Sequence, residues 1–469
     1  MVYTCAILQS RPSFLRHNNR PLNLPIIGYL HKLDPLTPHL TFTELAKKYG
    51  PVYSIKLGMV SAAVIADAKI LKKLLTRQDT VLRPPFYVLD IVFQRKGLIC
   101  TDVDLWKDQR KFVQNFLKVV GGSRASQNKS TCEALIRKHS QEFVQVVKNH
   151  DGVAINPSEL ISHYIVNITG TLFVGNSFSM NKNTVTEFSH CLEEITKALA
   201  SPLNFFPFLR FLPIFKKHLT LIDQVLHRIR KIQNQLLSQC EKSNSKTDLP
   251  SSLIETFLMQ MSKDNQHIYN LNQLHHLLLD LSLAFFDTTT TSLQWIVLYL
   301  AQHEEVQNRV RQEILDRPVD DFLNLHYTRA TLAEVARIRS IASIAFPHYA
   351  SENISIENFT IPKGTLLMPL LWAIHMDPHV FAEPEEFRPE RFLDSDGKFF
   401  KPEGFVPFQC VCAAVIGDSL SVTAAGRRSL KKAWKPKSRW VFKKDLDHGT
   451  SRKGVWVYTN FYDFPLLNF

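Results

Sequence analysis

The feature that most constrains the fold of this chain is one long apolar stretch, residues 271–314. Drawn as a helix, its middle is apolar on nearly all sides, so the helix has to be buried. His, Asp and Thr residues lie inside it, and these favour the core of a large domain over a membrane span. We therefore expect one helix over 271–314, and we expect its first part, 271–300, to cross the centre of the molecule.

The rest of the sequence predicts a mainly α fold with a small β region. Apolar residues recur at helical spacing between about 100 and 320. A short amphipathic helix is expected at 39–50, with two strands directly after it, and residues 351–370 alternate as short strands do. Four prolines within 21–38 predict an extended, packed segment rather than a helix.

Composition narrows the class of protein without choosing a function. The chain has 469 residues, 45% of them hydrophobic, which is enough for a large buried core. The net charge of +13 suits a nucleic acid, an anionic membrane, an acidic partner or simply a solvated surface, and charge alone does not choose among them. Of these partners we expect no nucleic acid. The seven cysteines are odd in number and lack zinc-site spacing, and no secretory signal is evident. We therefore expect a reducing compartment.

Two pairs of residues have spacings that bear on chemistry. Asp287 and Thr288 place an acid and a hydroxyl inside the apolar helix, as a proton relay requires, although a polar patch facing a neighbouring helix is the alternative. Glu334 and Arg337 share one helix face and can form a bidentate pair, either buried or on the surface.

Three further motifs complete the set. Trp106 and Arg110 can present an indole N–H and a guanidinium to one anionic group, or pack together as a simple surface pair. The stretches FRPERF (387–392) and GFVPF (404–408) place arginines and aromatic residues on rigid proline loops.

Taken in order and spacing, these motifs resemble the cytochrome P-450 family of haem-thiolate monooxygenases over residues 20–420. The resemblance implies the single-domain cytochrome P-450 fold, haem b with its iron as cofactor, and an endoplasmic reticulum location on the cytosolic face. It also implies electrons from NADPH–cytochrome P-450 reductase or an adrenodoxin-like ferredoxin. Segments 32–53, 97–117 and 201–213 further resemble insect ecdysteroid hydroxylases of the 25-hydroxylase type, so an apolar, steroid-like substrate is expected.

The resemblance also implies a role for each motif. Asp287 and Thr288 would deliver protons on the distal side of the haem, and Ala284 and Phe285 would line the substrate pocket. The brace of the proximal side would be formed by Glu334, Arg337, Arg388 and Arg391, and the haem propionates would be held by Arg83, Trp106, Arg110 and His348.

The chain departs from the family pattern at two places. Phe285 stands where the family's central helix has glycine, and a ring there would crowd the oxygen groove. The proximal loop is degenerate from residue 409: Ala413 replaces the propionate arginine and Val415 the ligand cysteine, so the metal ligand is missing at its expected position. The substitutes, Cys412 and Cys410, fall three and five residues early.

Three hypotheses for function follow. The first is a working steroid-type monooxygenase that uses Cys412 or Cys410. The second is a family member that is inactive as written, and the third is a non-enzymatic protein that binds an apolar ligand or an acidic partner. The basic segment 421–469 is interpreted as a disordered tail or, alternatively, as such a partner-binding segment.

Membrane contact is expected to be peripheral. The N-terminal residues contain no apolar run of about 18 residues, so we expect neither a membrane-spanning helix nor a cleavable signal peptide. A dense apolar run over 205–215 is closed by Lys216 and Lys217. Such a run can enter a bilayer interface while its lysines meet anionic lipid, or it can roof the substrate pocket.

Overall fold

The computed structural model describes residues 21–121, 129–150, 156–175, 178, 180–242, 252–264, 268–317 and 322–407. The fold is mainly α-helical with a small β region, as the sequence predicts. The helices are α1 (Pro38–Tyr49), α2 (Ala68–Leu75), α3 (Tyr87–Phe93), α4 (Val103–Gly121), α5 (Lys129–Asn149), α6 (Pro157–Val174), α7 (Lys182–Leu199), α8 (Pro213–Lys242), α9 (Leu253–Lys263), α10 (Leu271–Ser282), α11 (Thr288–Gln302), α12 (Glu304–Asp316), α13 (His326–Ile338) and α14 (Leu371–His375).

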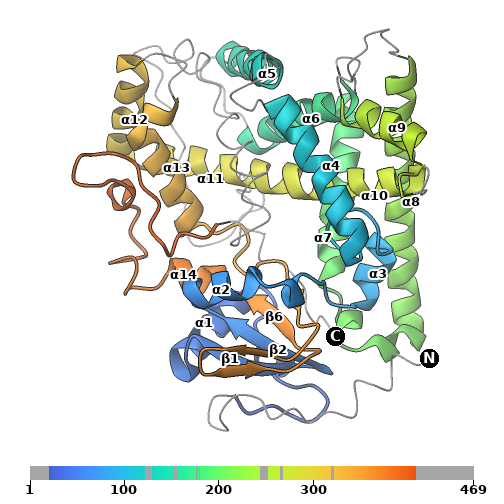
Figure 1. Cartoon of the computed structure of the whole chain (residues 1–469). Helices are drawn as coiled ribbons and strands as arrows, with labels where there is room; N and C mark the ends of the chain where they lie inside the picture. Colours follow the sequence, from blue (N-terminus) through green and yellow to red (C-terminus); the bar gives the residue numbers. More distant parts are fainter. Residues whose placement is uncertain are drawn as a thin grey trace, which may run out of the picture.

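The helices surround a central pair, and the sheet lies at one end of the molecule. In Figure 1, α10 and α11 run across the middle, with α8 and α9 at one end of them and α12 and α13 at the other. The strands lie below this layer, next to α1 and α2. The predicted central course of 271–300 is therefore confirmed.

The β region is a four-stranded mixed sheet and a separate hairpin. The sheet order is β1 (Val52–Leu57), β2 (Val60–Ile65), β6 (Leu366–Pro369) and β3 (His348–Tyr349), and only the β2–β6 pair is parallel. The hairpin pairs β4 (Ile354–Ile356) with β5 (Phe359–Ile361). Strands from both ends of the described chain thus share one sheet, which brings 52–65 beside 348–369.

The central helix is less regular than the sequence predicts. A single π-helical turn, η5 (Leu283–Asp287), separates α10 from α11. The helix then ends at Gln302, because His303 leaves the helical region with φ −118° and ψ 81°, and α12 starts at Glu304. The prediction of one helix to residue 314 was therefore wrong. The sequence contains no sign of the break, because neither glycine nor proline stands at it.

Two apolar clusters lie on different faces of the central helix. Leu279 and Phe286 pack into the cluster that also contains side chains of α7, α8 and the sheet. Leu281 and Phe285 pack into the cluster shared with α4, α6 and α9. Because successive residues of a helix point about 100° apart, the adjacent phenylalanines serve different clusters.

The N-terminal segment 21–37 is largely non-helical, as its prolines predict, and it is packed only in part. It forms isolated bridges around Gly28 and one 3-10 turn, η1 (Leu30–Lys32). Leu22 is 82% exposed and Ile26 67% exposed, whereas Gly28 and Leu30 are buried, so the predicted packing is right near the second pair and wrong near the first. Across the described residues, no helix combines the length and apolar character that a membrane crossing needs.

Candidate functional site

The π turn places an acid and a hydroxyl at the middle of the central helix. The Thr288 hydroxyl donates to the carbonyl oxygen of Ala284, four residues earlier, at 2.6 Å, a bond that competes with the regular backbone hydrogen bonds of the helix. Ala284 is exposed although most of α10 around it is buried, so the helix borders open space at this point. Burial, together with the nearby Glu193 carboxylate, raises the pKa of Asp287 to about 6.

Phe285 and Thr290 flank this position. Phe285 is buried among apolar side chains, and its predicted place in the substrate pocket stays a prediction. Thr290 is also buried, and its hydroxyl has no hydrogen-bond partner among the described residues. Sequence reasoning missed Thr290, although the run of threonines 288–291 was the signal for it.

A second acid in the central helix holds a distant loop. One carboxylate oxygen of Asp280 accepts the backbone N–H groups of Leu98 and Ile99, at 2.5 and 2.8 Å. The Gln273 side chain also exchanges two hydrogen bonds with the backbone of Gly97. Burial raises the pKa of Asp280 to about 7, against the two amide donors that lower it. Sequence reasoning missed this contact because 182 residues separate Asp280 from Leu98.

Arg83 and His348 lie near one another, and their predicted role at the haem propionates stays a prediction. Arg83 Nη1 donates to the carbonyl oxygens of Phe346 and Pro347, at 3.2 and 3.0 Å. His348 Nδ1 lies 2.8 Å from the carbonyl oxygen of Thr80 and therefore donates to it. Both side chains are half-buried, and the Arg83 guanidinium contacts the backbone directly before His348.

Trp106 and Arg110 form the expected pair on α4. The Arg110 guanidinium lies over the indole of Trp106, 4.9 Å from the ring centroid. Both side chains are half-buried. This stack fits a surface pair as well as a pair that meets an anionic group, so its role stays a prediction.

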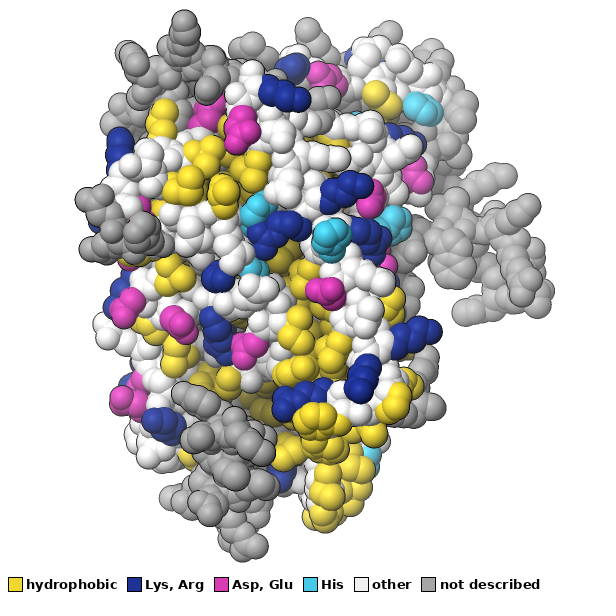
Figure 2. All heavy atoms as spheres, turned by 90° about the vertical axis from the view of Figure 1, so that its right-hand side faces the viewer, with side chains coloured by type: hydrophobic (Ala, Val, Ile, Leu, Met, Phe, Trp, Pro, Cys, Tyr) yellow, Lys and Arg dark blue, Asp and Glu magenta, His cyan; other side chains and the backbone are white. Residues whose placement is uncertain are grey.

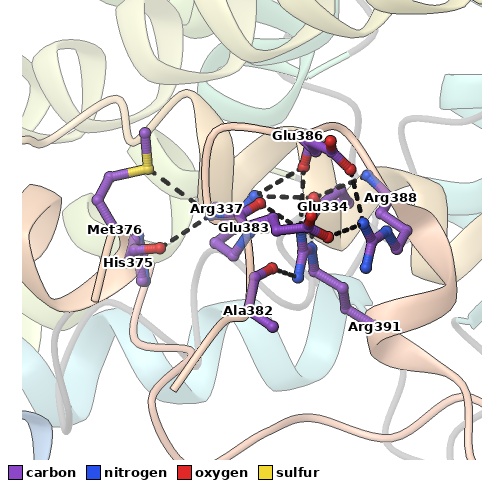
Figure 3. A network of polar contacts seen from close by, with 9 residues as sticks. All are labelled: Glu334, Arg337, His375, Met376, Ala382, Glu383, Glu386, Arg388 and Arg391. Atoms are coloured by element: carbon purple, nitrogen blue, oxygen red, sulfur yellow. Dashed lines mark hydrogen bonds and ion pairs between the residues drawn. The ribbon is translucent and has the colours of Figure 1, made fainter. Parts of the chain in front are cut away.

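The Glu334–Arg337 pair of α13 is completely buried (Figure 3). Arg337 Nε and Nη2 donate to the two carboxylate oxygens of Glu334 at 2.7 and 2.8 Å. Arg391, in the 3-10 turn η7 (Pro389–Phe392), donates to the same carboxylate at 3.2 Å. The structure therefore selects the buried pair over the surface pair.

Arg388 contributes to this network in an unexpected way. Its backbone N–H donates to Glu334 at 3.0 Å, whereas its guanidinium turns outward. There it pairs with the carboxylates of Glu383 and Glu386 (Figure 3). Of the two predicted arginines, only Arg391 therefore reaches Glu334 with its side chain.

The candidate ligand region lies outside the described residues. Cys410, Cys412, Ala413 and Val415 all follow Pro407, the last residue that the structure describes. Within the described ranges, no three His, Cys, Asp or Glu side chains are grouped so that they could hold a metal ion. The expectation that a metal ligand is missing at Val415 thus rests on sequence.

A helical framework of this kind, with a buried Glu-Arg pair that the PERF turn contacts, is typical of haem monooxygenases. The family model for cytochrome P-450 matches residues 19–409, so the chain belongs to the cytochrome P-450 family. Cytochrome P-450 306a1 of Drosophila melanogaster is 29% identical over 448 residues, which cover 83% of this chain and 78% of that protein. Cytochrome P-450 2U1 of Homo sapiens is 30% identical over 418 residues, or 83% and 74%. Cytochrome P-450 2J3 of Rattus norvegicus is 29% identical over 433 residues, or 87% and 84%.

Proposed function

We propose that this chain derives from monooxygenases that hydroxylate an apolar, steroid-like substrate, and that it does not form a haem-thiolate complex as written. One observation carries the second part. The family match ends at residue 409, at the start of the loop in which Val415 stands at the place of the ligand cysteine. A valine side chain has no atom that can bind iron.

The described residues supply basic and indole groups of the kind that hold haem propionates. Ala284 is exposed in the middle of the molecule, and Arg83 and His348 bring a cation and an imidazole to one place. These two, with Trp106 and Arg110, would hold the propionates. Haem held by a thiolate supplies the activation of dioxygen in this family, and the ligand position of this chain does not fit that requirement.

Asp287 and Thr288 would handle protons beside the open space at Ala284. A carboxyl group with a pKa of about 6 exchanges protons readily at neutral pH. The Thr288 hydroxyl donates to the Ala284 carbonyl, and its oxygen can still accept a hydrogen bond. Asp287 would therefore take up and release the protons, and the Thr288 oxygen would orient a hydrogen-bond donor near it.

The buried Glu334–Arg337 pair would brace the proximal side, where reductase or ferredoxin delivers electrons in the family. The arginines that contact Glu334 come from α13 and from 388–391, so these contacts tie α13 to the segment before residue 408. A steroid-like substrate is supported by the likeness of segments 32–53, 97–117 and 201–213 to insect ecdysteroid hydroxylases.

Peripheral contact with the endoplasmic reticulum membrane is supported by an exposed apolar patch. Phe211 is 69% exposed and Ile214 67% exposed, in the 3-10 turn η4 (Pro207–Phe211) and at the start of α8. Figure 2, which views the right-hand side of Figure 1, shows hydrophobic side chains gathered at the lower end of that face. Lys216 and Lys217 follow at once and can meet anionic headgroups on the cytosolic side.

Sedimentation with vesicles of phosphatidylcholine and phosphatidylserine tests the membrane contact. The double change Phe211→Ser and Ile214→Ser should release the protein from the vesicles. The change Leu323→Ser is the control, because Leu323 is also exposed but belongs to η6 (Phe322–Asn324), between α12 and α13. Equal binding of both variants would refute this patch as the contact.

Haem titration of two purified chains tests the main proposal. The unmodified chain should bind haem weakly, whereas the double change Ala413→Arg and Val415→Cys should bind it stoichiometrically. Full occupancy of the unmodified chain that is lost in Cys412→Ala or Cys410→Ala would overturn the proposal. Absence of haem from both chains would favour the non-enzymatic alternative.

A further inference from the structure

We propose that His375 is a positioning residue that fastens the segment before residue 408 to the buried Glu334–Arg337 pair. His375 ends α14 and has no solvent exposure. Its ring contacts two parts of the chain that lie far apart in sequence. These contacts are made within the described residues and do not depend on haem.

The first contact holds the approach to the proximal loop. The backbone N–H of Val406 donates to His375 Nε2 at 3.0 Å. The ring of Phe405 also stacks on the imidazole, with centroids 5.7 Å apart and an interplanar angle of 28°. Val406 lies two residues before Phe408, so the ring of His375 sets the direction from which the chain approaches the loop.

The second contact joins His375 to the end of α13. His375 Nδ1 and the Ser340 hydroxyl oxygen lie 2.5 Å apart, and the Ser340 hydroxyl also lies 3.1 Å from the carbonyl oxygen of Arg337. In return, Arg337 Nη1 donates to the carbonyl oxygen of His375 at 2.8 Å (Figure 3). Three residues thus form a closed ring of hydrogen bonds that includes the buried arginine.

These partners determine the tautomer of His375. Nε2 has to carry a lone pair, because it accepts the N–H of Val406. A neutral imidazole then has its proton on Nδ1, which donates to the Ser340 hydroxyl oxygen, and that hydroxyl donates onward to the backbone carbonyl of Arg337. Burial and the charge of Arg337 lower the pKa of His375 to about 3, so the neutral ring persists at ordinary pH.

The tautomer leads to a matched pair of substitutions. A glutamine oxygen can reach the place of Nε2 and accept the Val406 N–H, whereas an asparagine amide reaches only the place of Nδ1 and can bond Ser340. Both substitutions remove the ring, so the loss of stacking on Phe405 is the same in each. The two variants therefore separate the two contacts: His375→Gln keeps the contact to Val406 and loses that to Ser340, whereas His375→Asn does the reverse.

Hydrogen exchange of the full chain, read on the Val406 amide, tests the proposal. We expect exchange at Val406 to be roughly tenfold faster in His375→Asn than in the unmodified chain, and close to the unmodified rate in His375→Gln. The amides of α13 should stay protected in both. Equal exchange at Val406 in the two variants would overturn the proposal.

A second measurement needs no substitution and covers the case in which a variant does not fold. Nitrogen-15 chemical shifts of labelled histidine in the unmodified chain should show His375 protonated on Nδ1 and unprotonated on Nε2. The opposite tautomer, or a charged ring at neutral pH, would contradict the proposed contact. Neither measurement uses haem, so the failure of the haem proposal would leave both results interpretable.

Discussion

Replacing Arg337 by lysine should destabilise the protein more than the same change at any exposed arginine. Arg337 has no side-chain exposure and directs two N–H groups at Glu334, at 2.7 and 2.8 Å, and a third at the carbonyl oxygen of His375. A lysine ammonium can replace one of these bonds, so two charge-assisted bonds are lost. Each such bond is worth about 1.5–3 kcal/mol, and breaking a buried pair costs about 3–5 kcal/mol.

Two contacts limit the loss. The guanidinium of Arg391 and the backbone N–H of Arg388 still reach Glu334, so its carboxylate keeps two donors. We therefore expect Arg337→Lys to lower the free energy of unfolding by about 3 kcal/mol, at the lower end of that range.

Urea unfolding followed by circular dichroism measures the change. The matched control is Arg388→Lys, because that guanidinium pairs with Glu383 and Glu386 at the surface, and little change is expected there. If Arg337→Lys were no more destabilising than Arg388→Lys, the argument that the pair holds through its buried bidentate geometry would be wrong.

Two further predictions concern the contact between the central helix and the loop at residue 97. Asp280 keeps its proton to about pH 7 in the folded chain but only to about pH 4 when unfolded, so the stability that it contributes falls as pH rises between these values. Asp280→Asn does not titrate, so its free energy of unfolding should rise relative to that of the unmodified chain by at most about 4 kcal/mol between about pH 4 and pH 7. Unfolding measured at several pH values tests this, and a difference that stays constant with pH would contradict it. Gly97→Ala should lower the free energy of unfolding in urea clearly more than Gly397→Ala. Both glycines have φ near +70°, but only at Gly97 would the new Cβ lie 2.3 Å from the Asp280 carboxylate. Equal losses in the two variants would rule out the clash.

The parts of the fold that follow local periodicity could be predicted from the sequence. The helix at 39–50 and the central course of 271–300 depend on the spacing of apolar residues along one element. The end of the central helix at His303 could not be predicted, because no helix-breaking residue stands there. The exposure of Ile26 was also missed, since prolines exclude a helix but say nothing about burial.

The same distinction applies to the candidate site. Glu334 and Arg337 could be paired from sequence because residues three apart meet on one helix face. Asp280 and Leu98, or His375 and Val406, belong to elements that only the folded chain brings together. Composition and spacing contain no signal for such contacts, so the structure is needed to find them.

The central claim is that this member of the cytochrome P-450 family cannot hold iron through a thiolate, and the carbon-monoxide difference spectrum of the purified, reduced chain tests it most directly. The account predicts no thiolate-type band for the unmodified chain, and the appearance of that band after Ala413→Arg and Val415→Cys. A full thiolate-type band in the unmodified chain, abolished by Cys412→Ala, would contradict it.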